Sequence, residues 1–436
     1  MLNRIVPEYS DVIVIGGGPT GLATATQLKQ LGVETVIILE REPQAGGVVR
    51  HCGHSPFGLK EFKKIMLGPA YAAALVQKAI DVGVQVFVNC SVVKLHEKGR
   101  LTITTNEGIA EISAKCVVLS TGVRETPRAP RLISGERPLG ITTTGALQSM
   151  VYLKGSVPFK KPVIVGSELV SFSALLTCRS AAIKPVAMLE VNSRISAYAV
   201  SALLPKLFGI PLLKETKLLE IIGKERVSAV KVENSQGQIE QIECDGVLFT
   251  GQFVPESSLM RMGHLAIDHN IAGPVIDQYG QCSDPSYFAV GNVTHPVETA
   301  GWCWREGLAQ AAMIKQSLSR TSQQTPSISL PPIPLPVVLK SALIKYITPQ
   351  LINLAVLEKS QLHFQLRVQK AVTGELSVRQ SKQVLWSRHA SFLPERRILI
   401  PLNCLNTNSG ILEKINHKDP LEIYFTEQYY STEKNR

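Results

Sequence analysis

Several features that would place this 436-residue sequence in a common class of protein are missing from it. Its eight cysteines include no C-x-x-C pair, which argues against a redox dithiol, a zinc ribbon and an iron–sulfur cluster. No run of about twenty apolar residues occurs, so no transmembrane segment is predicted. The net charge is +11, but the Lys and Arg residues form no basic stripe, so we expect no nucleic-acid partner.

The N-terminus also lacks the apolar core and cleavage site of a signal peptide, because "MLNRIVPEYSDVIVIGGG" enters a strand almost at once. Scattered cysteines without such a peptide are typical of a reducing compartment, so we expect a cytoplasmic protein. The most apolar stretch, 333–357, is interrupted by Lys340, Lys345 and Pro349. We expect it to pack against the main body, with attachment to a membrane surface as the alternative.

A strand–glycine–helix–strand pattern opens the sequence. Residues 11–15 predict a buried strand, and "GGGPTG", a helix-like segment and the apolar run "ETVIILE" follow. Gly16, Gly18 and Gly21 have the Gly-x-Gly-x-x-Gly spacing that allows a tight turn, a close approach of backbone to pyrophosphate, and helix–strand packing. Glu40 ends the next strand, where a carboxylate accepts hydrogen bonds from ribose. The pattern predicts a dinucleotide site; a glycine turn used only for packing is the alternative.

Three further segments decide between NAD and FAD by resemblance. Together with the glycine motif, "EREPQAGGVVR", "VVLSTGVRETPR" and "YFAVGNVTHPVETAG" resemble the FAD-binding signatures of the two-dinucleotide-domain flavoproteins, which include the pyridine nucleotide–disulfide oxidoreductases. The resemblance covers about residues 10–318 and implies that a late Gly-Asp pair meets the ribityl–phosphate portion of FAD. Here Asn292 replaces the usual Asp. The residues implied to hold FAD are Gly16, Gly18, Pro19, Thr20, Gly21, Glu40, Arg41, Gly46, Gly47, Thr121, Gly122, Gly291, Asn292, Glu298 and Thr299.

A narrower resemblance concerns the substrate. "RHCGHSPFGLKEF", "GPAYAAAL" and "GVRETPRAPRLISGERPLGITTTGALQ" are similar to segments in the flavoprotein subunits of opine oxidase, hydrogen cyanide synthase and dye-linked L-proline dehydrogenase complexes. This implies an oxidoreductase that oxidises a small amine or amino acid, or relays its electrons, beside a second flavoprotein subunit. Members often carry a Cys-rich iron–sulfur segment near the C-terminus, which is absent here. An NADH-dependent flavin reductase of a small-molecule or protein acceptor, and a non-catalytic flavin-binding accessory subunit, are the alternatives.

Residues 163–190 repeat the pattern of the first unit. Gly166 and Glu190 are 24 positions apart, as are the first glycine and the acidic residue of the opening unit. In the wider family this position binds NAD(P)H. Glu190 disfavours a 2′-phosphate, so NADH is expected rather than NADPH.

Two glycines of the motif are replaced in this second unit, and one of the replacements opposes a nucleotide. Glu168 occupies the position of the second glycine, where it adds a side chain and negative charge near the expected pyrophosphate. Ser171 replaces the third glycine and still allows packing. The sequence therefore leaves two possibilities open: NAD bound at Gly166 and Glu190, or a retained fold that holds no nucleotide or binds one in a shifted pose.

Other candidates carry weaker patterns. His51, Cys52 and His54 are close in sequence but do not form a standard ligand set, so we predict a loop near the flavin and no metal site. Residues 302–304, "WCW", either pack in the core or contact substrate or flavin. Arg124 either counters flavin or substrate charge or forms an exposed ion pair. No catalytic residue is predicted, because in flavoenzymes the cofactor performs the redox step.

The predicted fold class is α/β, with two Rossmann-like dinucleotide-binding domains, the second inserted in the first, and a small β-rich C-terminal module. We expect an FAD domain from 1–150 and 250–318 and a second dinucleotide domain from 151–249. A Ser-, Gln- and Pro-rich linker spans 319–336. Alternation of apolar and polar residues predicts antiparallel strands within 337–436.

Overall fold

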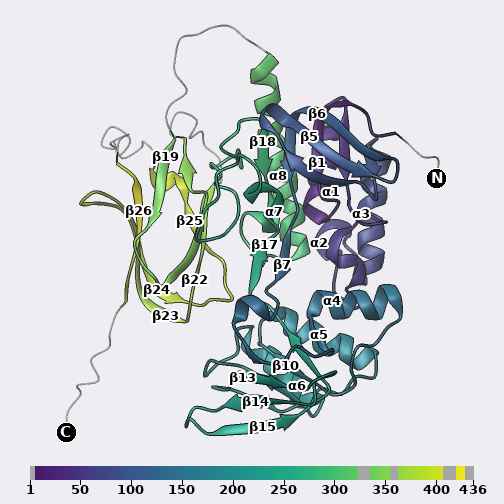
Figure 1. The fold of residues 1–436 in the computed structure, drawn as a ribbon. Helices are drawn as coiled ribbons and strands as arrows, with labels where there is room; N and C mark the ends of the chain where they lie inside the picture. The colour runs from purple at the N-terminus through teal and green to yellow at the C-terminus, as the bar shows by residue number, and fades with distance from the viewer. Residues whose placement is uncertain (1–4, 323–333, 354–361, 406–418, 428–436) are drawn as a thin grey trace.

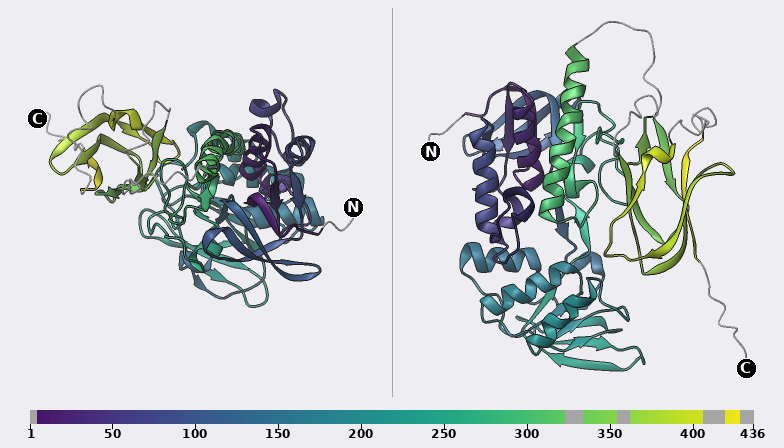
Figure 2. Two further views of the ribbon diagram at one scale, coloured as in Figure 1. Left: turned by 90° about the horizontal axis from the view of Figure 1, so that it is seen from above. Right: turned by 180° about the vertical axis from the view of Figure 1, so that it is seen from behind.

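The computed structural model describes residues 5–322, 334–353, 362–405 and 419–427. It contains two α/β units and a C-terminal β module (Figure 1). The first α/β unit, purple and blue in Figure 1, lies above the second, which is teal. The long helix α8 (Ala300–Ser322) runs between the first unit and the yellow C-terminal module, as both views in Figure 2 show.

A parallel sheet with the order β3-β2-β1-β6-β18 forms the centre of the first unit. Its strands are β1 (Tyr9–Ile15), β2 (Val36–Leu39), β3 (Gln85–Phe87), β6 (Gly108–Leu119) and β18 (Tyr287–Ala289). The second half of β1 and all of β2 are buried, as expected for short apolar runs covered on both faces. The N-terminal half of β6 extends beyond this sheet into an antiparallel meander with β5 (Arg100–Thr105) and β4 (Ser91–Leu95).

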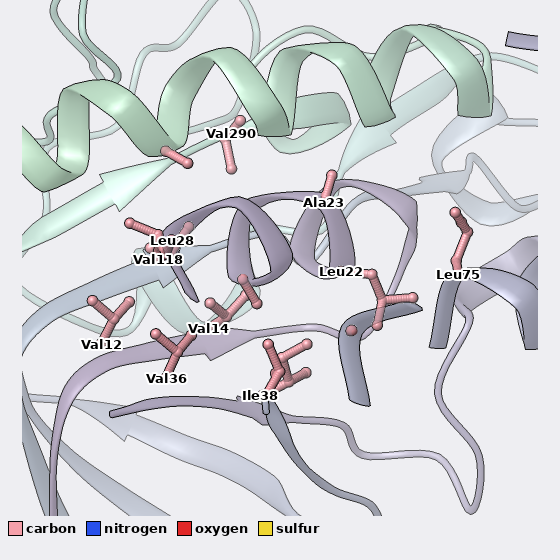
Figure 3. Packing of buried hydrophobic residues seen from close by; sticks show 14 of the residues in the cluster. Val12, Val14, Leu22, Ala23, Leu28, Val36, Ile38, Leu75, Val118 and Val290 are labelled. Atoms are coloured by element: carbon pink, nitrogen blue, oxygen red, sulfur yellow. The ribbon is translucent and has the colours of Figure 1, made fainter. Parts of the chain in front are cut away.

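Three helices cover one face of this sheet: α1 (Pro19–Gln30), α3 (Gly68–Asp81) and α8. Figure 3 shows the apolar core between α1 and the strands, with Val12, Val14 and Leu28 among its members. Helices α1 and α8 cross closely at Gly307, whose carbonyl accepts a hydrogen bond of 3.2 Å from Thr24 Oγ1. A Cβ at this glycine would lie 2.6 Å from a backbone oxygen of α1.

The second unit repeats the parallel arrangement with the order β12-β11-β10-β16-β9. Its strands are β9 (Ile141–Thr143), β10 (Pro162–Val165), β11 (Ala187–Leu189), β12 (Leu212–Leu213) and β16 (Gly246–Phe249). A smaller sheet joins β8 (Ser134–Gly135), β13 (Lys217–Ile222), β14 (Ala229–Glu233) and β15 (Ile239–Glu243). The helices here are α4 (Thr144–Gln148), α5 (Leu169–Ser180) and α6 (Leu203–Leu207); α2 (Leu59–Phe62) and α7 (Ser258–Arg261) belong to the first unit.

The chain crosses between the two units twice, at neighbouring points. The outgoing strand β7 (Val123–Glu125) pairs antiparallel with the returning strand β17 (Phe253–Pro255). Figure 1 shows this two-stranded ribbon between the units. The second unit is therefore inserted in the first, and the predicted fold class is confirmed.

The C-terminal module is built from two sheets, β21-β19-β26-β23-β24 and β20-β22-β25, around one apolar core. Its strands are β19 (Leu335–Leu339), β20 (Ile344–Thr348), β21 (Leu351–Ile352), β22 (His363–Val368), β23 (Val372–Gln380), β24 (Gln383–Phe392), β25 (Ile398–Pro401) and β26 (Leu421–Glu427). All pairs are antiparallel except β19 with β26. Of the predicted linker 319–336, the start continues α8 and the end begins β19; residues 323–333 lie outside the described residues.

The module packs on both α/β units. Gln350 accepts a hydrogen bond from Ile276 N, and its own backbone N–H donates to the Ile276 carbonyl, each at 3.1 Å. On the second unit, Arg194 forms an ion pair of 2.7 Å with Glu395. The described part of the apolar stretch 333–357 thus contacts the main body. Within the described ranges, every helix is too short or too polar to cross a bilayer.

Candidate functional site

The glycine turn between β1 and α1 distinguishes two structural glycines from a third. Gly16 has a φ of +106°, and a Cβ there would lie 2.6 Å from the Ser120 carbonyl oxygen. A Cβ on Gly21 would lie 2.1 Å from the carbonyl oxygen of Gly16. Gly18, in contrast, has a φ of −78°, and the nearest atom to its added Cβ is 3.9 Å away. Packing explains the first two glycines, while the open space at Gly18 fits a ligand that approaches the backbone closely.

The acidic residue at the end of β2 is held by backbone donors. Glu40 is 7% exposed, and its two carboxylate oxygens accept hydrogen bonds of 2.9 Å from Gly17 N and Glu42 N. Each oxygen keeps a lone pair for a further donor, such as a ribose hydroxyl. The neighbouring Arg41 is exposed.

Two distant glycine segments meet the same helix N-terminus. A Cβ on Gly47 would lie 2.8 Å from the Gly18 Cα, and Gly46 N donates a hydrogen bond of 2.7 Å to the Gly17 carbonyl. Gly291, from the end of the first unit, leaves no room for a Cβ beside Thr20, which follows Pro19 in the first turn of α1. The fold therefore brings three of the predicted segments together.

Arg50 is a further candidate for this site that no sequence motif predicts. Its side chain lies over Gly46, where an added Cβ would be 2.9 Å from Arg50 Cγ. Its Nε is buried and has no hydrogen-bond partner among the described residues, and its nearest carboxylate is that of Glu42, at 3.8 Å. A buried, incompletely paired guanidinium beside an open glycine turn suits an anionic group such as pyrophosphate. The arginine ends the quoted segment "EREPQAGGVVR", but no spacing rule assigned it a role.

The second half of the predicted cofactor site lies before α8. The Asn292 amide bonds the backbone of Glu298 twice, as a donor to its carbonyl at 3.1 Å and as an acceptor from its N–H at 2.8 Å. The Glu298 carboxylate faces Arg367 of the C-terminal module, 2.9 Å away. Thr299 is exposed and directly precedes α8. The Glu298 carboxylate is therefore paired within the protein, while its backbone N–H and carbonyl hold the Asn292 side chain in the loop before α8.

A second buried pair supports Gly291. His295 Nε2 lies 2.7 and 2.8 Å from the two oxygens of Glu306, and one of these oxygens accepts a hydrogen bond of 3.0 Å from Gly291 N. Burial opposes the charge on His295, but the adjacent Glu306 carboxylate outweighs it and raises the pKa of the imidazole. Burial alone would raise the pKa of Glu306, but the pairing with His295 outweighs burial and lowers it.

The segment after β6 lies beside the ribbon between the units. Thr121 Oγ1 donates a hydrogen bond of 2.6 Å to the Glu256 carbonyl, and Gly122 accepts one from Glu256 N at 2.9 Å. Gly122 has a φ of +76°, and no described atom lies within 4 Å of an added Cβ. Arg124 is mostly exposed and lies 3.7 Å from the Glu256 carboxylate, so the exposed ion pair is the alternative that the structure adopts.

The remaining sequence candidates have ordinary surroundings. Burial lowers the pKa of His51 to about 4 and raises the pKa of the Cys52 thiol to about 12, so both groups are neutral at pH 7. His54 Nε2 lies 2.6 Å from Ser173 Oγ on α5 of the second unit. Cys303 and Trp304 are buried in the core. In the described part of the chain, no group of three His, Cys, Asp or Glu residues could hold a metal ion.

The second unit has the same turn but fills it with side chains. Gly166 has a φ of +115° and packs on Thr250, as the first glycine of the opening unit packs on its serine. Ser171 Oγ lies 2.6 Å from Thr250 Oγ1. Glu168 Oε1 accepts a hydrogen bond of 2.7 Å from Gln252 N, and a Cβ added to Gly251 would lie 2.5 Å from that oxygen. The Glu168 carboxylate therefore packs against backbone beyond the glycine turn.

The acidic residue of the second unit has more internal hydrogen bonds than its counterpart in the first. Glu190 is 3% exposed; its Oε1 accepts hydrogen bonds from the backbone and side-chain nitrogens of Asn192, and its Oε2 accepts one from the Ser167 hydroxyl. Ser167 Oγ accepts a further bond of 2.8 Å from Ser196 N. The carboxylate that would bind ribose thus has three donors within the chain, one more than Glu40 has.

Comparison with known proteins gives consistent matches. The family model described as pyridine nucleotide-disulphide oxidoreductase matches residues 10–313. Dihydrolipoyl dehydrogenase from Manduca sexta is 27% identical over 355 residues, covering 70% of this chain and 68% of that protein. An opine oxidase subunit from Agrobacterium tumefaciens is 23% identical over 318 residues, covering 65% and 61% respectively. The crystal structure of L-proline dehydrogenase from P. horikoshii matches with a TM-score of 0.55 and 19% identity, over 73% of this chain and 58% of that chain. The resemblance inferred from the sequence is confirmed.

Proposed function

This chain belongs to the pyridine nucleotide-disulphide oxidoreductase family, whose members are FAD-dependent oxidoreductases, and we propose that a small amine or amino acid, not NADH or NADPH, reduces its FAD. One observation carries this proposal. Glu168 and Glu190, which stand where a second nucleotide would place its phosphates and ribose, are hydrogen-bonded to the chain itself.

The first unit suits FAD by the same criteria. Gly18 leaves open space at the N-terminus of α1, where backbone N–H groups and the helix dipole favour phosphate. We assign Arg50 to the pyrophosphate and Glu40 to the adenosine ribose. Asn292 holds the loop that precedes α8 through its two hydrogen bonds to Glu298. The N-terminus of α8 would then stabilise negative charge on a reduced flavin. When bound, FAD supplies the redox chemistry, and these residues position it.

The assembly state is part of the proposal. The opine oxidase protein to which this chain is similar is, by its name, one subunit of an oxidase. We infer that this chain also works beside a second flavoprotein subunit that oxidises the amine or amino acid or passes on its electrons. We propose that the protein is cytoplasmic, because seven of its cysteines are free thiols in the described part of the chain.

An anaerobic titration of the purified protein tests the electron source. The visible flavin band should be present at the outset and should persist through NADH and NADPH additions. Rapid bleaching by NADH would overturn the proposal in favour of an NADH-dependent flavin reductase. Absence of the band from a folded protein would overturn the FAD assignment for this chain.

The partner is tested separately by affinity purification from the native source under mild conditions. The expected result is co-purification of a second flavoprotein, together with bleaching of flavin by an amine or amino acid. If the isolated chain is bleached by such a substrate at the same rate, the partner is unnecessary. If neither preparation is bleached although flavin is bound, the chain is an accessory flavin-binding subunit.

A further inference from the structure

A cavity of about 380 Å³ lies between α8 and the C-terminal module. One wall is the face of α8 that carries Trp302, Glu306 and Gln310, and the opposite wall comes from the C-terminal module, including Arg397. In Figure 2, α8 separates this side of the first unit from α1 and α3. The predicted FAD turn at Gly18 belongs to the α1 side, so the cavity lies across α8 from that turn. Two residues of its wall, His295 and Glu306, also support Gly291 of the predicted FAD site from the side of the cavity.

Two polar groups on the cavity wall have no partner in the described part of the chain. His295 is 4% exposed; its Nε2 bonds Glu306, while its Nδ1 is buried without a hydrogen bond. Gln310 Nε2 is likewise buried and unpaired. Burial lowers the pKa of His295, but the adjacent Glu306 carboxylate outweighs it and raises that pKa; in the charged imidazole, Nδ1 is an N–H donor. Buried donors without partners are costly, so two on one cavity indicate a ligand with acceptor atoms.

The charges around the cavity favour an anion. The Arg397 guanidinium stacks on the Trp302 indole at 3.9 Å from its centroid, and Arg305 lies 5.3 Å from the same ring. Among the described residues, neither arginine has a carboxylate within 4.0 Å. Two carboxylates line the cavity: Glu306 is paired with His295, and Asp277 accepts hydrogen bonds from two backbone N–H groups. Arg397 also attracts the Glu306 carboxylate from beyond ion-pair distance. The two arginines and His295 outnumber the two carboxylates, so the site favours an anion.

The donors form two groups along the helix. Trp302, with Arg397 stacked on it, and Glu306, which holds His295, are four residues apart on α8, about 6 Å along the axis; Gln310 is four residues further, so the helix positions behind the two groups span about 6–12 Å. A ligand that satisfies both groups needs an acceptor at each end. We propose that this cavity binds a small dicarboxylate of four or five carbons, with one carboxylate at Arg397 and Arg305 and the other at His295 and Gln310.

Calorimetric titration of the FAD-loaded protein tests this site, with succinate as the probe. Inorganic phosphate and putrescine, a dication of similar length, serve as comparison ligands. We expect saturable succinate binding with a Kd below about 1 mM, weaker phosphate binding, and none of putrescine. Arg397→Gln should weaken succinate binding at least tenfold, while Arg396→Gln, at the exposed neighbouring position, should change it less than twofold.

A second variant, Gln310→Leu, tests the site independently in case Arg397→Gln weakens binding only by disturbing the fold. Gln310→Leu removes one unpaired donor from α8 and should weaken succinate at least threefold while the thermal midpoint is kept. No succinate binding by the parent protein, or equal affinity in parent, Arg397→Gln and Gln310→Leu, would overturn the proposal. Tighter binding of phosphate with the same dependence on Arg397 would overturn the dicarboxylate assignment, and binding of putrescine would overturn the anion assignment.

Discussion

Glu298 and Arg367 form an ion pair of 2.9 Å in which both side chains are nearly buried, at 5% and 9% exposed. The pair joins the loop before α8 to strand β22 of the C-terminal module. Arg367 also donates a hydrogen bond of 2.8 Å to the Val297 carbonyl, so one guanidinium holds two successive residues of that loop. The C-terminal module therefore fixes the segment whose backbone receives the Asn292 side chain.

Arg367→Met should strongly destabilise the protein, because it leaves the Glu298 carboxylate buried without its cation. Removal of one partner from a buried pair costs about 3–5 kcal/mol. The double variant Glu298→Gln with Arg367→Met should recover a large part of this loss, since it buries no unpaired charge. Urea unfolding of the three proteins, followed by circular dichroism, measures both effects. A double variant no more stable than Arg367→Met would show that the uncompensated charge is not the cause.

Gly18→Ala and Gly21→Ala should separate ligand binding from folding. The Cβ added at Gly18 meets no described atom closer than 3.9 Å, so the apoprotein should keep its thermal midpoint while FAD affinity falls at least tenfold. The Cβ added at Gly21 lies 2.1 Å from the Gly16 carbonyl oxygen, so that variant should lose about 1–3 kcal/mol of stability or more. Fluorescence titration with FAD and thermal unfolding of the apoproteins provide the two readouts. Unchanged FAD affinity in Gly18→Ala would refute the site assignment.

Asn292→Asp should impair the protein, although aspartate is the usual residue of the family at this position. The Asn292 amide donates to the Glu298 carbonyl, and a carboxylate would place an acceptor against that oxygen. We expect a loss of about 1–3 kcal/mol and faster FAD release. Asn106→Asp, in the exposed turn between β5 and β6, is the matched control and should behave like the parent. Thermal unfolding and the rate of FAD dissociation test this; a stabilised Asn292→Asp protein would contradict it.

Glu168→Gly with Ser167→Gly should open the second unit to NADH. The first change removes the carboxylate packed on Gly251, and the second frees one oxygen of Glu190 for a ribose hydroxyl. We expect NADH binding to tighten at least tenfold relative to the parent, measured by quenching of protein fluorescence. Glu168→Gln keeps the bulk and should bind no better than the parent. Equal affinity in all three proteins would show that the side chains at these positions do not block the site.

The sequence predicted the parts of this molecule that depend on local pattern. Apolar runs predicted the strands of the opening unit and of its repeat at 163–190, and glycine spacing predicted the turn at Gly16; the short strands β9 and β12 were not predicted. It also identified Glu168 as the anomaly of the second unit. The three hydrogen bonds to the Glu190 carboxylate were not predictable, because Ser167 and Asn192 follow no spacing rule that connects them to it.

The long-range contacts were also beyond the sequence. Arg50 lies beside the Gly18 turn only because Gly46 and Gly47 fold onto it, and His295 shares a cavity with Arg397 only in the folded chain; their sequence neighbours do not distinguish either residue from an ordinary polar residue. Glu298 was predicted to contact FAD. Its carboxylate pairs with Arg367, so a contact with FAD remains a prediction for its backbone alone. That partner belongs to a module that lies outside the matched family region, so no motif connected the two.

Asp277 should make stability depend on pH in mildly acidic solution. Burial raises its pKa from an ordinary 3.8 to about 6, against two backbone hydrogen bonds that lower it. Between these values the folded state keeps a proton that the unfolded state has released. This group's contribution to stability is therefore full below pH 3.8 and is lost as pH rises through about 6. The loss is about 3 kcal/mol.

The variant Asp277→Asn separates this titration from the loss of hydrogen bonds. Its amide keeps an acceptor oxygen for Tyr279 N and Gln281 N but buries no charge. The variant should therefore match the parent near pH 4 and exceed it in unfolding free energy at pH 7. Asp81→Asn, at the exposed end of α3, is the control and should differ from the parent equally at both pH values. Urea unfolding at the two pH values measures this, and a difference between Asp277→Asn and parent that does not change with pH would contradict it.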